Sequence, residues 1–98
     1  MTLNEIREDL KDIRYYYSRK QLFDSVVSEI GSNSIQLKLQ KYNEAVREAP
    51  PKLFDLYVCL YIHNNTQESV SVELHYTPEY IQMLNKKLLK FFQEKFSA

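Results

Sequence analysis

The 98-residue chain has little of several residue types, and each shortage argues against a class of protein. With a single glycine, it cannot contain the glycine-rich loops that hold phosphates in nucleotide-binding proteins. One glycine and three prolines also argue against a loop-rich or β-rich protein, since these residues dominate turns. The single cysteine, Cys59, excludes an internal disulfide framework and fits a reducing cytoplasm.

Candidates for catalysis and for metal binding are equally scarce. The two histidines, His63 and His75, are too few for a metal site. Cys59 lies in an apolar stretch, which favours a small buried residue over a nucleophile. No apolar run approaches the ~20 residues that span a bilayer, and residues 1–5 lack the pattern of a secretory signal. We therefore expect a cytoplasmic protein without enzyme activity, cofactor, metal or membrane partner.

What the chain has instead is helix-forming sequence with 44% apolar residues, enough for the core of one domain. A first helix is predicted over residues 1–31, because Thr2 and Glu5 form a capping box and Gly31 is a stop signal. Its apolar stripe comprises Leu3, Ile6, Leu10, Ile13 and Tyr17, and continues, shifted, through Phe23, Val26, Val27 and Ile30. This stripe either packs only on the rest of the chain or also pairs with a second copy in a homodimer.

Residues 34–49 fit two patterns. Ile35, Leu37 and Leu39 alternate with polar residues, as they would in a half-buried strand. A helical stripe also runs through this segment, from Ile35 to Ala49. A lone strand would leave its backbone hydrogen bonds unmade, and no second strand is evident. We therefore predict a connecting helix over residues 34–49.

Proline marks the start of the next helix. Pro50 and Pro51 open a stretch whose apolar residues recur at helical spacing. These residues are Leu53, Phe54, Leu56, Tyr57, Leu60 and Tyr61. The polar, turn-prone residues 63–65 then end the stretch.

Two cap signals define the last two helices. Thr66 is a good N-cap for a short helix that ends near Leu74. Thr77 followed by Pro78 starts another helix, because threonine is favoured at the N-cap and proline at the first helical position. The three residues 75–77 then form the short turn of a helix-turn-helix, whose second helix enters the major groove of DNA.

The apolar pattern supports this motif. Small Ser71 lies where a bulky side chain would hold two crossing helices apart. Apolar residues of the two helices fall at Val70, Leu74, Ile81 and Leu84, and the last helix continues through Leu88, Phe91, Phe92 and Phe96. We therefore predict one all-α domain over residues 1–98. It has four or five helices and a C-terminal tri-helical helix-turn-helix unit over residues 51–98.

At this point the residues resemble known regulators. The string from Thr66 to Val70, followed by Leu74 and Ile81, looks like the helix-turn-helix signature of phage repressors. A longer string is similar to the sigma-factor region-4-like regulators of Gram-positive phages and mobile elements, of the autolysin-regulator type. Its residues are Leu56-Tyr57, Leu60-Tyr61, Asn65–Glu68, Leu74, Tyr80-Ile81 and Leu84–Leu88.

The family resemblance covers roughly residues 40–96 and implies a small activator of late or lysis genes. Two positions depart from the usual signature. His75 stands where glycine is usual in the turn, and Ser71 stands where alanine is usual.

The motif assigns roles to the recognition helix, predicted over about residues 78–90. Gln82 is expected to form hydrogen bonds with adenine edges, and Glu79 is expected to accept one from cytosine. Tyr80 and Met83 are expected to contact thymine methyl groups or to pack beside sugars. Contacts to phosphates are expected from Gln67, Thr77, Lys86, Lys87 and Lys90. The alternative for each is a solvated helix face, and for Tyr80 it is partial packing in the core.

Charge is the main objection to binding of double-stranded DNA, because 13 basic residues balance 13 acidic ones. Residues 78–98 carry four lysines against two glutamates, and acidic residues concentrate in residues 5–9. A second basic group comprises Arg14, Arg19 and Lys20. A neutral chain should bind DNA weakly as a single copy, which favours a homodimer or RNA polymerase as a partner. The rival hypothesis is a helical module that binds RNA polymerase or another regulator instead of DNA.

Overall fold

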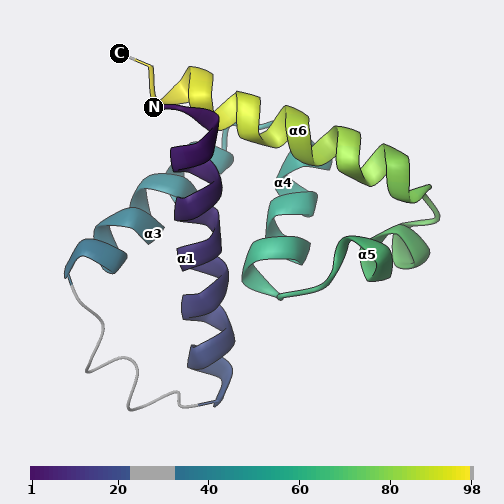
Figure 1. The fold of residues 1–98 in the computed structure, drawn as a ribbon, viewed down its shortest axis with the longest axis horizontal. Helices are drawn as coiled ribbons and strands as arrows, with labels where there is room; N and C mark the ends of the chain where they lie inside the picture. The colour runs from purple at the N-terminus through teal and green to yellow at the C-terminus, as the bar shows by residue number, and fades with distance from the viewer. Residues whose placement is uncertain (23–32, 98) are drawn as a thin grey trace.

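The computed structural model describes residues 1–22 and 33–97, and this part of the chain is all-α, as predicted (Figure 1). Its helices are α1 (Leu3–Leu22), α3 (Asn33–Val46), α4 (Pro51–Tyr57), α5 (Gln67–Leu74) and α6 (Pro78–Lys95). One turn of π-helix, η1 (Val58–Ile62), extends α4. The predicted continuation of the first helix to residue 31, with Phe23, Val26, Val27 and Ile30, lies outside the described residues.

The N-terminal helix α1 begins at the predicted capping box. The Glu5 N–H donates to Thr2 Oγ1 (3.1 Å), and the Thr2 nitrogen donates to Glu5 Oε1 (3.2 Å). Its stripe residues Ile6, Leu10 and Ile13 are at most 1% exposed, and α1 packs against α3, η1 and α6. This part of the stripe is therefore buried within the chain, and pairing with a second copy stays a prediction.

Helix α3 settles the ambiguity of the segment after residue 33 in favour of a helix. It ends at Val46, however, and not at Ala49 as predicted. Residues 47–49 form a tightened turn in which the Ala49 N–H donates to the Val46 carbonyl (3.0 Å). The cause is Pro50, because a proline disfavours helical geometry in the residue before it.

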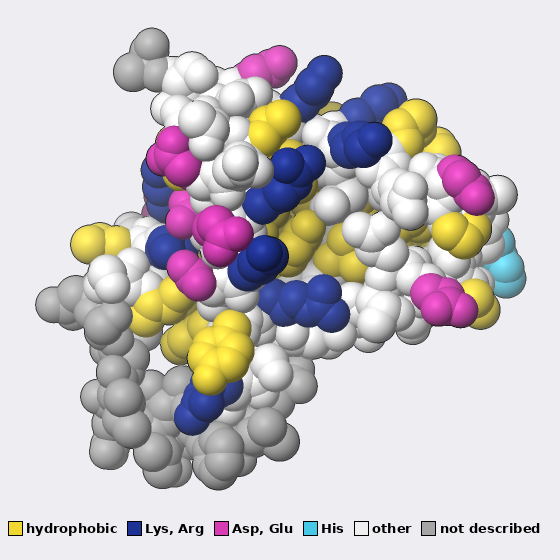
Figure 2. Space-filling view, viewed as in Figure 1, with side chains coloured by type: hydrophobic (Ala, Val, Ile, Leu, Met, Phe, Trp, Pro, Cys, Tyr) yellow, Lys and Arg dark blue, Asp and Glu magenta, His cyan; other side chains and the backbone are white. Residues whose placement is uncertain are grey.

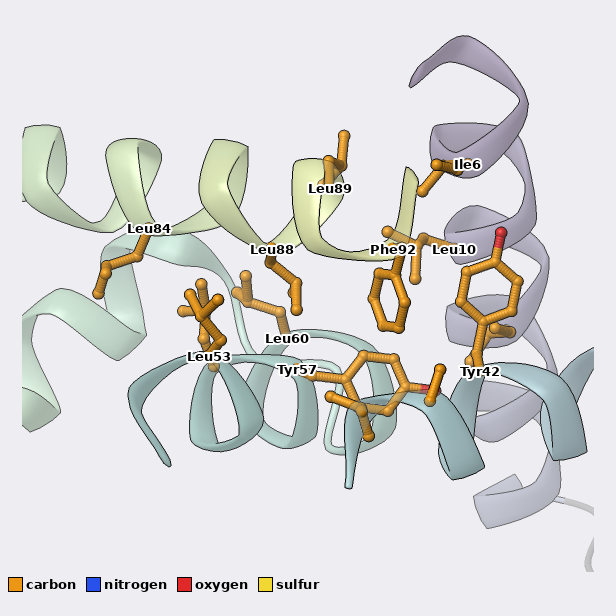
Figure 3. Close-up of a cluster of buried hydrophobic side chains, with 14 of the residues drawn as sticks. Ile6, Leu10, Tyr42, Leu53, Tyr57, Leu60, Leu84, Leu88, Leu89 and Phe92 are labelled. Carbon is orange, nitrogen blue, oxygen red and sulfur yellow. The ribbon is translucent and has the colours of Figure 1, made fainter. Parts of the chain in front are cut away.

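An aromatic cluster joins α3, α4 and α6. Phe92 of α6 points between Tyr57 of α4 and Tyr42 of α3 in the close-up of the core (Figure 3). All three side chains are fully buried. Both tyrosine hydroxyls have partners: Tyr42 donates to Asp9 Oδ2 (2.7 Å) and Tyr57 donates to Asn43 Oδ1 (2.6 Å). This core fixes α6, whose N-terminal half projects beyond it toward α5 (Figure 1).

Candidate nucleic-acid interface

Helices α5 and α6 are joined as the sequence predicts. The Thr66 side chain accepts a hydrogen bond from the Ser69 N–H (3.0 Å) and caps α5. The Thr77 side chain accepts one from the Tyr80 N–H (3.1 Å) and caps α6, with Pro78 at the first helical position. Only residues 75–77 separate the two helices. Helix α6 then runs to Lys95, five residues beyond the predicted limit of the recognition helix.

The turn between these helices depends on a left-handed residue. His75 ends α5 with φ 60° and ψ 36°, the conformation that glycine adopts most readily. In this geometry the Tyr76 N–H donates to the Ser71 carbonyl (2.9 Å), which also accepts from the His75 N–H, so the end of α5 is closed by hydrogen bonds. The chain thus makes the predicted turn without the usual glycine, at a cost in conformational strain.

Replacing His75 with glycine should therefore raise the free energy of unfolding by about 0.5–1 kcal/mol, measured by urea denaturation. A left-handed conformation costs a non-glycine residue roughly 1–2 kcal/mol, and the greater freedom of glycine in the unfolded chain offsets part of that gain. The matched control is His63→Gly, because His63 has a right-handed conformation (φ −84°, ψ −6°) and should gain nothing. A loss of stability in His75→Gly would contradict the strain argument.

The contact between α5 and α6 explains the small residue of the motif. Ser71 is 3% exposed, and its hydroxyl donates to the Glu68 carbonyl (2.7 Å) within α5. Val70, Ile81 and Leu84 are buried, as the pattern predicts. Leu74 was expected to be buried with them, but it is 38% exposed. It lies in the last turn of α5, where it forms one wall of an open cavity of about 110 Å³.

The outward face of α6 carries most of the predicted DNA contacts. Exposed residues on this face are Glu79, Gln82, Met83, Lys86, Lys87 and Lys90. Gln82 and Lys86 are four residues apart, so they share one side of the helix. Lys87 is four residues from Met83 and lies on the neighbouring side. Gln67, at the first position of α5, is half-buried, and Thr77 is exposed.

Tyr80 is the exception among the predicted base contacts, because its side chain turns toward α4. Its hydroxyl accepts a hydrogen bond from Lys52 Nζ (3.1 Å), and its ring lies 4.8 Å from that of Tyr76. The ring is therefore half-buried instead of pointing outward. Its position in the first turn of α6 made it look like a base contact, whereas the packing of α4 decides its direction.

The sequence reasoning missed a basic stripe on α1, because it grouped Arg14 with Arg19 and Lys20 and left out Arg7 and Lys11. Arg7, Lys11 and Arg14 are spaced by four and three residues, so they form a stripe along one side of α1, which we call the α1 basic stripe. In sequence order they alternate with acidic residues, which hides the stripe. Helical spacing was the signal that would have revealed it. Arg19 donates to the Tyr15 hydroxyl (2.7 Å), and the side chain of Lys20 lies outside the described residues.

Two acidic residues of α1, Asp9 and Asp12, lie on another side of the helix, against α3. Lys38 Nζ pairs with Asp12 Oδ2 (2.8 Å) and with Asp9 Oδ1 (3.2 Å). The hydrogen bond with Asp12, and then that with Asp9, raises the pKa of Lys38 despite its partial burial. Figure 2 shows the result, a face on which Lys and Arg side chains gather over α1 and α6. The pairing with Lys38 therefore keeps two of the acidic residues of α1 away from its basic stripe.

Cys59, predicted to be a small buried residue, is partly buried. Burial raises the pKa of its thiol, and the negative charges of Glu73 and Asp55 raise it further. A reactive cysteine requires the opposite shift. Among the described residues, no group of three or more potential ligands could hold a metal ion, and no helix could cross a membrane.

Comparisons with protein-family models, with curated proteins and with solved structures give no match for this chain. The resemblance to sigma region-4-like regulators therefore stays a prediction. Any functional conclusion depends on the geometry of α5, α6 and the charges around them.

Proposed function

We propose that this protein is a transcription regulator that binds double-stranded DNA sequence-specifically, with α6 in the major groove. One observation carries the proposal: α5 and α6 pack at the buried Ser71 and are joined by a three-residue turn through left-handed His75. This arrangement buries Ile81 and Leu84 and leaves the outward face of the first turns of α6 exposed. A major groove is wide enough to admit an α-helix presented in this way.

The exposed side chains of α6 match two kinds of DNA contact. Gln82 would form paired hydrogen bonds with adenine, Glu79 would accept from cytosine, and Met83 would contact thymine methyl groups. Lys86, Lys87 and Lys90 would bind phosphates and fix the position of the helix on the duplex. Gln67 and Thr77 would contact phosphates from the N-terminal ends of α5 and α6, where helix N–H groups favour anions. Tyr80 would hold α6 against α4 and would not read bases.

The test is a titration of the protein onto random duplex DNA at low and physiological salt, followed by sequencing of the bound fraction. Enrichment of one sequence supports the proposal, and a two-fold repeat about one helical turn apart would indicate a dimer. Sequence-blind binding, or no binding, would contradict it.

Two substitutions on α6 should separate base contacts from phosphate contacts. Gln82→Ala should weaken binding to the enriched site by roughly 5- to 150-fold and change the preferred base there. Lys86→Ala should weaken binding to all sequences and reduce the slope of log K against log salt by about 0.9. Gln36→Ala is the control, because Gln36 is exposed on α3. If both α6 variants bind like the wild type, α6 is not the recognition helix.

A second function, binding to RNA polymerase or another regulator without DNA, is favoured by a different surface. Val72 on α5 is 74% exposed, and Leu74 on α5 and Phe54 on α4 are each 38% exposed. Exposed apolar side chains of this size are common at protein contacts. A protein that enriches no DNA sequence but binds purified RNA polymerase would support this function instead.

A further inference from the structure

The α1 basic stripe has the length and composition of a phosphate-binding surface. At a rise of 1.5 Å per residue, Arg7 and Arg14 lie about 10 Å apart along α1. Arg7 and Lys11 are exposed, and Arg14 is half-buried. Arginine suits a phosphate because its planar guanidinium donates two parallel hydrogen bonds.

Contacts made by the stripe show which part of the molecule it faces. Arg14 Nη2 donates to the carbonyl of Asn64 (3.4 Å), in the loop that leads into α5. The Tyr61 hydroxyl donates to Asn85 Oδ1 of α6 (2.7 Å). Burial raises the pKa of Tyr61, while the bond with Asn85 and the positive charges of Arg14 and Arg7 offset part of that increase. The stripe therefore lies beside the loop that leads into α5, on a helix that itself packs against α6.

Little negative charge opposes the stripe on its own side. Asp9 and Asp12 are paired with Lys38 on the other side of α1. Lys11 pairs with Glu8 (3.3 Å), but both side chains are at least 70% exposed, so water and salt screen the pair. Arg7 has a neutral partner, Asn4 Oδ1, at 3.5 Å. Most of the positive charge of the stripe is thus available to a ligand.

We propose that Arg7, Lys11 and Arg14 bind the phosphate backbone of the same duplex whose major groove receives α6. The inference rests on the proposed function, and it adds a second contact region from the N-terminal helix. These contacts carry no base preference, because phosphates are alike in all sequences. They explain how a chain of zero net charge could bind DNA, since Lys and Arg side chains of α1 and α6 gather on one face, where acidic side chains also occur (Figure 2).

The test compares Arg7→Gln and Lys11→Gln with the control Arg47→Gln, an exposed arginine after the end of α3. Affinity for the enriched duplex and for a scrambled duplex is measured between about 50 and 200 mM salt. Each α1 substitution should reduce the salt slope by about 0.9 on both duplexes, while the enriched sequence stays the same. Arg47→Gln should keep the wild-type slope. Arg14 is not substituted alone, because its hydrogen bond to the α5 loop also supports the fold.

The outcomes separate this inference from the proposed function. If Lys86→Ala lowers the salt slope and neither α1 variant does, the second contact region is excluded and the recognition helix stands. If Arg47→Gln lowers the slope as much as the α1 variants, the effect comes from net charge alone and the inference is wrong. If the wild type binds no duplex, the proposed function fails and the inference fails with it.

Discussion

Replacing Phe92 with alanine should lower the free energy of unfolding by about 3–5 kcal/mol, the largest loss expected from a single substitution here. Phe92 is fully buried, and its ring centroid lies 4.9 Å from that of Tyr42 and 5.7 Å from that of Tyr57. Both pairs are edge-to-face, a geometry that adds about 0.5–1.5 kcal/mol beyond burial. The substitution would leave a cavity where α3, α4 and α6 meet.

Urea unfolding followed by circular dichroism measures the effect, and two further variants make it interpretable. Phe54→Ala is the matched control, since Phe54 is 38% exposed and its removal leaves no enclosed cavity. Its loss should be less than half that of Phe92→Ala. Phe92→Leu preserves most of the volume and should cost less than about 1.5 kcal/mol, so it remains measurable if the alanine variant does not fold. Equal losses at positions 54 and 92 would show that the aromatic cluster is not the core.

Helix starts were predictable because they depend on local chemistry. The signals are Thr66 for α5, and Thr77 with Pro78 for α6, and they act through hydrogen bonds and backbone angles within one helical turn. Both helices begin where expected. The predicted end of α3 was three residues too late, although Pro50, which causes the helix to end earlier, was visible in the sequence. Helical periodicity continued through Ala49, and the periodicity was given more weight than the proline.

Side-chain directions were less predictable, because they depend on how helices pack. Leu74 and Tyr80 both flank the turn, where burial is decided by the crossing of α4, α5 and α6. The angle at which these helices cross cannot be inferred from the periodicity of one helix. Leu74 is therefore more exposed than predicted, and Tyr80 is more buried.

The α1 basic stripe shows a different kind of omission. Read as a string, residues 5–9 are a mainly acidic cluster, and this reading weakened the case for DNA binding. On a helix, successive residues are about 100° apart, so Arg7 and Asp9 lie on different sides of α1. Lys38 then occupies the acidic side, which no local pattern could predict from a position 26 residues or more away. Net charge therefore says nothing of how the basic residues of α1 are arranged on the helix.

Alkaline pH should unfold this protein steeply, because two tyrosines cannot ionise while they remain in the core. Burial raises the pKa of Tyr42, and the adjacent Asp9 carboxylate raises it further. Burial likewise raises the pKa of Tyr57, with smaller contributions from Tyr17 and Tyr61. In the unfolded chain these hydroxyls titrate near pH 10. Above that pH the unfolded state binds fewer protons than the folded state, so stability falls as pH rises.

The expected loss is about 1.4 kcal/mol per pH unit for each of the two tyrosines, and it begins near pH 10. Urea unfolding at a series of pH values from neutral to strongly alkaline measures this slope. Tyr42→Phe should reduce the slope by about 1.4 kcal/mol per unit, although it also loses the hydrogen bond to Asp9 at every pH. Tyr15→Phe is the matched control, because Tyr15 is 61% exposed and should leave the slope unchanged. If Tyr42→Phe kept the wild-type slope, the Tyr42 hydroxyl would have to ionise without unfolding, and its burial against α1 would be wrong.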